Sequence, residues 1–213
     1  MKKLILIHFI LIFPALLIAQ KDVTQFLGIP VDGYKTEMIE KLQSKGYTYI
    51  KESDVFQGEF NGQDVNIFLQ TYNNKVWRIA IADQKGTDET NIKIRFNNLI
   101  QQFSNNDRYD ITEDEVSNYT ISEDEDISYE MLVNNKRYDA YFYQKPKTEI
   151  VKYAENVRKN DSISEKEKID LMVQRILSVT DKQVWFTIGE ISAEYYIYIY
   201  YVNPNNKASG QDL

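Results

Sequence analysis

Carboxylates and phenols are the side chains of this sequence that could bind or transform a ligand. The chain has 32 acidic residues and 16 tyrosines, but it has no cysteine, and its single histidine is His8. Because His8 lies in an N-terminal segment that we expect to be removed, Ser-His-Asp triads, Cys-His dyads and the usual zinc sites are excluded. No G-x-S-x-G elbow and no phosphate-binding glycine loop occurs. Carboxylate chemistry, calcium binding or binding without chemistry remain.

The acidic residues concentrate between Asp107 and Asp126, where nine acids accompany one base, Arg108. Oxygen ligands of this kind suit calcium, but the spacing of a calcium-binding loop is absent and the stretch Ser122–Asp126 lacks a glycine for a tight turn. We interpret the segment as a solvated connection between strands. The prediction is therefore no metal and no cofactor.

Two carboxylates facing each other across a cleft would permit glycoside hydrolysis. With 32 acidic residues, the sequence does not indicate which two could form such a pair. We predict that the protein is not an enzyme, and a carboxylate-dependent hydrolase is the remaining catalytic alternative.

Tyrosines alternate along two predicted strands and are the candidate binding residues. In the strand 194–202 a row of isoleucines faces one side and a row of tyrosines faces the other, and a second pair shares one face of the strand 139–144. Tyrosine combines a flat apolar ring with a polar tip, so these rows predict a surface for a protein or for stacking on glycans. The alternative is that the rings pack under a helix or pair across strands. The candidates are Tyr141, Tyr143, Tyr196, Tyr198 and Tyr200.

The first 19 residues have the order of a secretory signal peptide. Lys2 and Lys3 precede an apolar run from Leu4 to Ala19, with Leu17 and Ala19 ahead of a plausible cut before Gln20. A membrane span needs about 20 apolar residues, whereas this run has 16 and is interrupted by a histidine and a proline. Without a cysteine at the cut there is no lipid anchor. We expect a soluble protein, either periplasmic or extracellular.

Removal of this segment leaves 194 residues, enough for one large or two small domains. The mature chain then has 23 basic and 32 acidic residues, a formal net charge of −9. This charge disfavours nucleic acid and anionic membrane surfaces as partners. The expected partner is a protein or a glycan; stable membrane insertion is not expected, and the oligomeric state stays open.

The periodicity of apolar residues predicts an α+β fold. An apolar stripe from Tyr34 to Leu42 indicates a helix, and Gly46 is placed to end it in a left-handed conformation. Four short strands follow up to residue 83, with Asn61-Gly62 and Asn73-Asn74 as tight turns. The alternation in the last strand puts Trp77 on the same face as the isoleucines that follow it.

A second unit repeats this order. Residues from Ile92 to Phe103 form an amphipathic helix, which Thr87 or Asp88 could cap. Strand candidates follow at 108–112, 118–122, 128–133 and 136–144, with an Asn134-Asn135 turn before the last. The repeated order indicates an internal duplication of a helix-plus-antiparallel-meander unit.

The remaining chain departs from the repeat. A short helix over 147–160 and a helix opened by the capping box Ser164-x-x-Glu167 precede two strands, 183–190 and 194–202. The predicted organisation is a signal peptide (1–19), a first unit (20–86), a second unit (87–145), a C-terminal helix and β-hairpin (146–203) and a flexible tail (204–213).

The stretches FLGIPVDGYKTEMIEKLQSKGY (26–47) and FQGEFNGQDVNIFLQTYNNKVWRIAIAD (56–83), and the final NNKASGQDL, resemble a group of uncharacterised secreted bacterial proteins. That resemblance spans most of the mature chain and implies no activity. Two tandem helix-plus-meander units are also similar in architecture to the β-lactamase-inhibitor-protein fold, with helices on one face of the sheet. They are similar as well to the small lipoproteins of outer-membrane barrel assembly, although this chain lacks the lipid-attachment cysteine.

These resemblances imply a protein-binding module, although fold alone does not determine function. We therefore predict an exported, non-catalytic interaction module of the bacterial envelope that binds a protein. A glycan-binding module that uses the tyrosine rows is the first alternative, and the hydrolase is the second.

Overall fold

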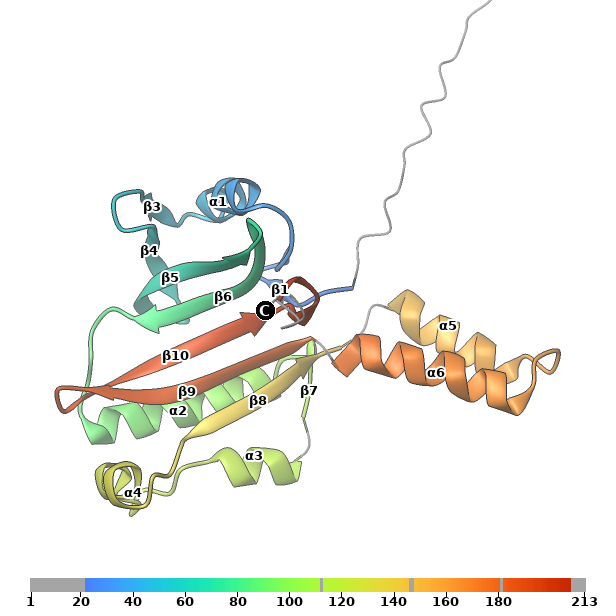
Figure 1. The fold of residues 1–213 in the computed structure, drawn as a ribbon. Coiled ribbons are helices and arrows are strands. Elements are labelled where there is room, and N and C mark those ends of the chain that lie inside the picture. The colour runs from blue at the N-terminus through green and yellow to red at the C-terminus, as the bar shows by residue number, and fades with distance from the viewer. Residues whose placement is uncertain (1–21, 112, 146–147, 181, 208–213) are drawn as a thin grey trace, which may run out of the picture.

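The computed structural model describes residues 22–111, 113–145, 148–180 and 182–207. Its strands are β1 (Gln25–Phe26), β2 (Ile29–Pro30), β3 (Thr48–Ile50), β4 (Val55–Phe60), β5 (Gln63–Tyr72), β6 (Lys75–Asp83), β7 (Tyr109–Asp110), β8 (Asp139–Gln144), β9 (Gln183–Ile191) and β10 (Glu194–Val202). Strands β1 and β2 form a small ribbon, and the other eight form one antiparallel sheet in the order β3-β4-β5-β6-β10-β9-β8-β7 (Figure 1). The α+β prediction is confirmed.

Helices α1 (Lys35–Ser44) and α2 (Glu89–Ser104) bury their apolar stripes against one face of this sheet. The face is marked by a row of directly paired core residues that crosses four strands: Ile67, Ile81, Ile199 and Phe186. Two shorter helices, α3 (Glu113–Tyr119) and α4 (Ile127–Val133), lie between β7 and β8 in sequence.

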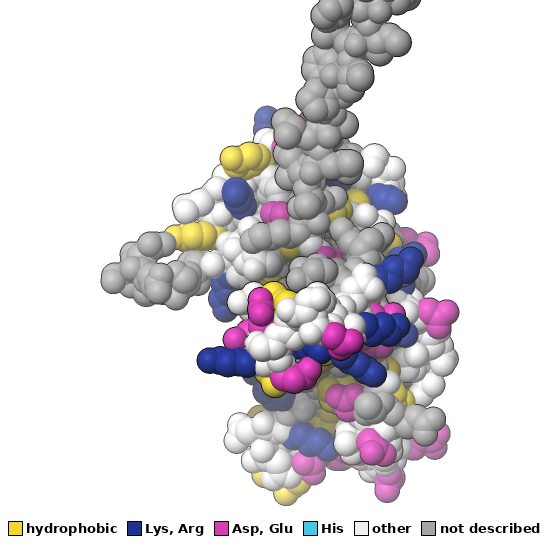
Figure 2. Space-filling view, turned by 90° about the vertical axis from the view of Figure 1, so that its right-hand side faces the viewer, with side chains coloured by type: hydrophobic (Ala, Val, Ile, Leu, Met, Phe, Trp, Pro, Cys, Tyr) yellow, Lys and Arg dark blue, Asp and Glu magenta, His cyan; other side chains and the backbone are white. Residues whose placement is uncertain are grey.

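Helices α5 (Thr148–Lys159) and α6 (Glu165–Thr180) form a hairpin that extends away from the sheet (Figure 1). Figure 2 looks onto this hairpin and shows acidic and basic side chains interspersed there. Within the hairpin, Lys168 Nζ lies 2.8 Å from Glu165 Oε1. No helix among the described residues is long and apolar enough to cross a bilayer.

The sheet consists of two runs of four neighbouring strands, β3 to β6 after helix α1 and β7 to β10 after helix α2. We call each run with its helix the first and the second unit. The two meanders meet where β6 pairs with β10. The predicted boundary at residue 145 thus separates β9 and β10 from their own meander, because α3–α4 and α5–α6 interrupt its order along the chain.

Two predicted strands in the second unit are wrong. Residues 128–133 belong to α4, which begins where Asp126 accepts a hydrogen bond from the Tyr129 backbone N–H at 2.8 Å. Residues 118–122 span the end of α3 and a loop, and this loop is hydrogen-bonded to the side chain of Asn97. This side chain accepts from Ile121 N at 2.9 Å and donates to Ile121 O at 2.7 Å. Short apolar runs do not distinguish helix from strand by period alone.

Three hairpin turns position the strands. Asn61-Gly62 and Asn73-Asn74 have positive φ at both central residues (51° and 73°, 48° and 60°), as predicted for type I′ turns. Ser192-Ala193 (φ 54° and 63°) makes the same kind of turn between β9 and β10, and its composition did not indicate one. Asn135 has φ 52° but follows α4, so Asn134-Asn135 does not join two strands.

Helix α1 ends as the sequence predicts. Gly46 has φ 95°, its N–H donates to Gln43 O at 3.0 Å, and Tyr47 N donates to Leu42 O at 3.3 Å. This pair of bonds is the Schellman arrangement, which satisfies carbonyls that the helix leaves unpaired.

Substitution of Gly46 by alanine is expected to lower the free energy of unfolding by about 1 kcal/mol, because a side chain disfavours the left-handed conformation. An added Cβ would meet no atom within 4 Å, so the cost comes from the backbone alone. Urea unfolding measures the change, with Lys45→Ala as the neighbouring control. Equal stability of Gly46→Ala and the wild type would contradict the role of this cap.

The predicted flexible tail is wrong for residues 204–207. A short 3₁₀ helix, η1 (Pro204–Asn206), follows β10, and the Asn206 side chain donates to Asp32 Oδ1 at 2.6 Å and Val76 O at 2.8 Å. Buried Asn203 donates to Val31 O at 2.8 Å. These amide contacts fasten the segment to the first unit. Residues 208–213 and the predicted signal peptide lie outside the described residues.

Candidate functional site

The sheet face turned away from α1 and α2 carries the candidate tyrosines. Along β10 the half-buried Tyr196, Tyr198 and Tyr200 alternate with Ile197 and Ile199, which are buried in the core. The alternation predicted from the sequence is therefore present. Tyr196, Tyr198 and Tyr200 therefore face away from the two large helices, whereas Tyr195 and Tyr201 of the same strand are buried in the core.

Three rings stack across neighbouring strands on this open face. Trp185 of β9 is directly opposite Tyr141 of β8 on one side and Tyr200 of β10 on the other. The ring centroids of Trp185 and Tyr141 are 5.8 Å apart with an interplanar angle of 21°, and those of Trp185 and Tyr200 are 4.2 Å apart at 27°. Both faces of the indole are thus covered by neighbouring rings.

Arg78 of β6 extends this stack. Its Cζ lies 5.0 Å from the ring centroid of Tyr200 and 4.6 Å from that of Trp77, within the range of cation–π attraction. Burial lowers the pKa of the Arg78 guanidinium, but arginine stays protonated in proteins. We call Tyr141, Trp185, Tyr200, Arg78 and Trp77 the aromatic ladder.

Trp77 belongs to the ladder because of a β-bulge. Gln70 pairs with Arg78 and Thr71 pairs with Val76, so Trp77 is the extra residue of β6. A bulge interrupts the alternation of side chains, and the contact with Arg78 places Trp77 on the open side. The prediction that Trp77 shares the core face with the following isoleucines is wrong for this reason.

A groove lies beside the ladder, along β6. Ala80 forms its floor between two larger residues paired with it, Phe68 of β5 and Tyr200 of β10. Ala82 continues the floor next to Tyr198. The groove has a volume of about 430 Å³, and Phe68 is 38% exposed. We call this hollow the alanine groove.

A hydrogen-bonded carboxylate stands at the rim of the alanine groove. Asp54, in the turn between β3 and β4, is paired with Lys35 and accepts a hydrogen bond from the Tyr49 hydroxyl at 2.7 Å. The hydrogen bond from Lys35, and then that from Tyr49, hold the pKa of Asp54 below its usual value. The rim thus combines a fixed carboxylate with the cationic Arg78, whose Nε donates to Gln70 Oε1 at 2.6 Å.

The five predicted tyrosines do not form one cluster. Tyr141 and Tyr200 join the ladder, and Tyr198 borders the groove while its ring covers Gly189 of the next strand. The Tyr196 hydroxyl donates to Glu194 at 3.0 Å, beyond the groove. Tyr143, which is 37% exposed, accepts from Gln183 Nε2 at 3.4 Å.

Sequence reasoning missed the residues that link these tyrosines, above all Trp185 and Arg78. Trp185 lies between the buried Val184 and Phe186, and this alternation could have placed it on the open face. The pairing of Tyr141 with Trp185 had no signal in the sequence, because the helices α5 and α6 separate their strands.

Four hollows among the described residues contain no pair of carboxylates. Each has a single acid in its lining, namely Asp22, Asp54, Asp83 or Glu123. Within the described ranges, no group of three or more Asp, Glu, His or Cys could hold a metal ion. The acidic segment 107–126 instead contributes β7, α3 and the cap of α4.

Comparison with family models, curated proteins and solved structures found no match for this chain. The resemblances to secreted bacterial proteins and to the β-lactamase-inhibitor-protein fold therefore stay predictions.

Proposed function

We propose that this protein is an exported, non-catalytic binding module that takes up a protein segment on the open sheet face. The observation that carries the proposal is the stacking within the aromatic ladder. Tyr141 and Tyr200 cover the two faces of Trp185, and Arg78 covers the other side of Tyr200. A sugar stacks on a free ring face, whereas neighbouring side chains cover both faces of Trp185 and of Tyr200, which favours a protein over a glycan.

The alanine groove also favours a protein over a glycan as the ligand. Its floor runs along β6, where Ala80 lies between Phe68 and Tyr200 and Ala82 lies beside Tyr198. Such a groove can accept an aromatic or branched side chain from an extended segment. Apolar anchors that fill pockets supply much of the affinity in protein interfaces, and a polar rim such as Arg78 and Asp54 fixes their register.

Export is part of the proposal. The Asp22 carboxylate lies 2.9 Å from Lys182 Nζ in a buried ion pair, so the chain is anchored to the sheet from this residue onward. The predicted cut before Gln20 leaves two residues ahead of the anchor. Cleavage there would leave the Asp22–Lys182 ion pair in the mature chain.

Selection of peptides from a random display library on the mature protein tests the function. We expect binders with an apolar anchor, and we expect Ala82→Trp, which fills the groove, to weaken them at least tenfold, or about 1.4 kcal/mol. Ile94→Trp is the matched control, because it places the same side chain on α2 at a position that is 54% exposed. Affinities are measured by calorimetry, and thermal unfolding verifies that both variants fold.

Two results would contradict binding of a protein segment in the alanine groove. If the library yields no binder, or if Ala82→Trp binds the selected peptides as well as the wild type does, the groove is not the binding site. A glycan array that yields ligands whose binding is lost in Trp185→Ala would instead establish the glycan alternative.

A further inference from the structure

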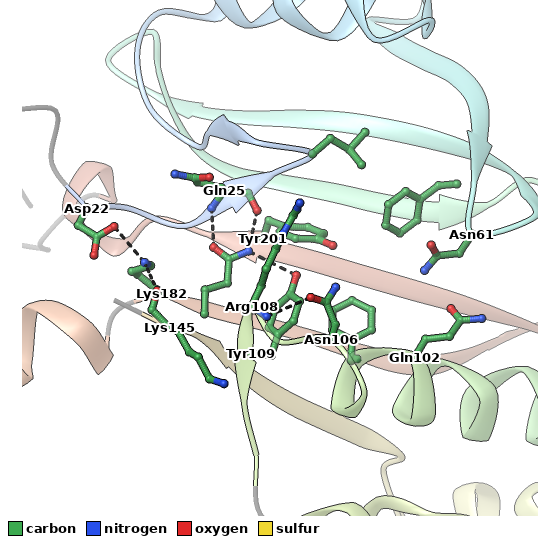
Figure 3. Close-up of a pocket in the computed structure, with 14 residues that line it drawn as sticks. Asp22, Gln25, Asn61, Gln102, Asn106, Arg108, Tyr109, Lys145, Lys182 and Tyr201 are labelled. Carbon is green, nitrogen blue, oxygen red and sulfur yellow. Dashed lines mark hydrogen bonds and ion pairs between the residues drawn. The ribbon is translucent and has the colours of Figure 1, made fainter. Parts of the chain in front are cut away.

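A second hollow lies at one end of the sheet, where the two units meet (Figure 3). It is bounded by β1, the β4–β5 turn, the C-terminal end of α2 and β7, with the ends of β8 and β10 behind it. Its volume is about 450 Å³, which is in the range of small-molecule sites. We call it the junction pocket. It shares no lining residue with the alanine groove.

The junction pocket is positively charged in an acidic protein. Arg108, Lys145 and Lys182 line it with one acid, Asp22, whereas the whole chain has a formal net charge of −7. Lys182 is paired with Asp22, and Lys145 Nζ lies 3.5 Å from Asp110 Oδ1. The side chain of Arg108, the residue before β7, crosses the pocket (Figure 3). A ligand with a carboxylate would meet a guanidinium there, which can bind it through two parallel hydrogen bonds.

Three amides line the pocket beyond the Arg108 side chain. Asn61 from the β4–β5 turn lies opposite Gln102 of α2, and Asn106, which follows α2, lies between Gln102 and Arg108 (Figure 3). Asn106 Oδ1 accepts from the Arg108 backbone N–H at 3.1 Å, which directs its NH₂ group to act as the donor. Amides both donate and accept hydrogen bonds, as sugar hydroxyls require. The nearly buried rings of Phe60 and Phe103 add an apolar part to this end.

The back wall is held in place by its own hydrogen bonds. Buried Gln144 accepts from Gln25 N at 2.8 Å, and its Nε2 donates to Gln25 O at 2.7 Å and to the Tyr109 hydroxyl at 3.3 Å. Burial raises the pKa of Tyr109 and of Tyr201, and the nearby Arg108 opposes this shift. Both phenols therefore stay protonated at neutral pH.

We propose that the junction pocket binds a small hydroxylated carboxylate of the size of a hexuronic acid. The carboxylate is held by Arg108, and the hydroxyl groups are held by Asn61, Gln102 and Asn106. This site is separate from the open sheet face, so it does not depend on the proposed function.

Titration of the isotope-labelled mature protein with D-glucuronate, followed by NMR, tests the site, with D-glucose and inorganic phosphate as reference probes. We expect glucuronate to shift the amide signals of Asn61, Asn106 and Arg108 and to bind at least tenfold more tightly than either reference. Arg108→Gln should raise the Kd for glucuronate at least tenfold. Arg137→Gln is the matched control, because its side chain is 72% exposed and does not line the pocket.

Three results would overturn the proposal. The first is the absence of saturable shifts at millimolar glucuronate. The second is binding of glucose or phosphate as tight as that of glucuronate. Equal binding of glucose would show that the carboxylate is not recognised, and equal binding of phosphate would show that the sugar is not recognised. The third is an equal loss of affinity in Arg108→Gln and Arg137→Gln. Amide spectra of Arg108→Gln and Arg137→Gln without ligand verify that both variants fold.

Discussion

Replacement of Phe186 by alanine is expected to lower the free energy of unfolding by about 4 kcal/mol. Phe186 is fully buried in the centre of β9. Its ring centroid lies 5.2 Å from that of Phe96 and 5.4 Å from that of Phe103, both on α2, and 5.6 Å from that of Phe142 on β8. The substitution therefore leaves a cavity at the point where α2 packs on the second meander, and it also removes the contacts between aromatic rings.

The neighbouring residue provides the control for this experiment. Trp185→Ala removes a larger side chain from the opposite face, but Trp185 is only half-buried, so we expect a loss of about 1–2 kcal/mol. Urea unfolding gives both values on one scale. If Trp185→Ala destabilises the protein as much as Phe186→Ala does, the open face supports the fold, and its assignment as a binding surface loses its basis.

The second large effect is expected for Asp83→Ala, about 3 kcal/mol. The Asp83 carboxylate accepts two hydrogen bonds from Arg95, at 2.9 Å to Nε and 2.5 Å to Nη2, and one from the Ile197 backbone N–H at 3.1 Å. It thereby links β6, α2 and β10. Both side chains are largely buried, with exposed fractions of 8% for Asp83 and 14% for Arg95. Removal of the acid leaves the guanidinium without this partner and the N–H group without its acceptor.

Two variants separate this effect from a general loss of surface charge. Glu37→Ala breaks the exposed pair with Lys41, whose charged atoms are 4.0 Å apart, and should cost less than 1 kcal/mol. Arg95→Met in the Asp83→Ala background should recover part of the loss, because it removes the uncompensated charge. Thermal and urea unfolding measure the series. Similar losses in Asp83→Ala and Glu37→Ala would show that the Asp83–Arg95 pair is effectively solvated.

The elements that follow from local chemistry could be predicted from the sequence. The stripe of α2, the Gly46 cap and the two asparagine turns all depend on residues within one or two turns of each other. The alternation of β10 is likewise local, so the separation of Tyr198 and Tyr200 from the isoleucine face was predicted, whereas the sequence left open whether these rings are exposed.

The features that depend on distant pairing could not be predicted in this way. The contact of Tyr141 with Trp185 requires the register of β8 against β9 across an inserted helical hairpin. The position of Trp77 depends on a bulge, which is set by how β5 meets β6. Helix α4 lies where a strand was predicted, and Asp126 caps this helix. The segment is too short for the period of its apolar residues to distinguish a helix from a strand.

The central position of β10 has a consequence for the order of folding. The first meander is complete at residue 83, but its β6 edge pairs only with residues 198–202 of the final strand. The shared core therefore cannot close until almost the whole chain is available. During synthesis or translocation β6 is an unpaired edge, and unpaired edges associate with other chains. Since β6 and β10 are so far apart in sequence, we expect slow folding and a need for protection of this edge until the C-terminal strand arrives.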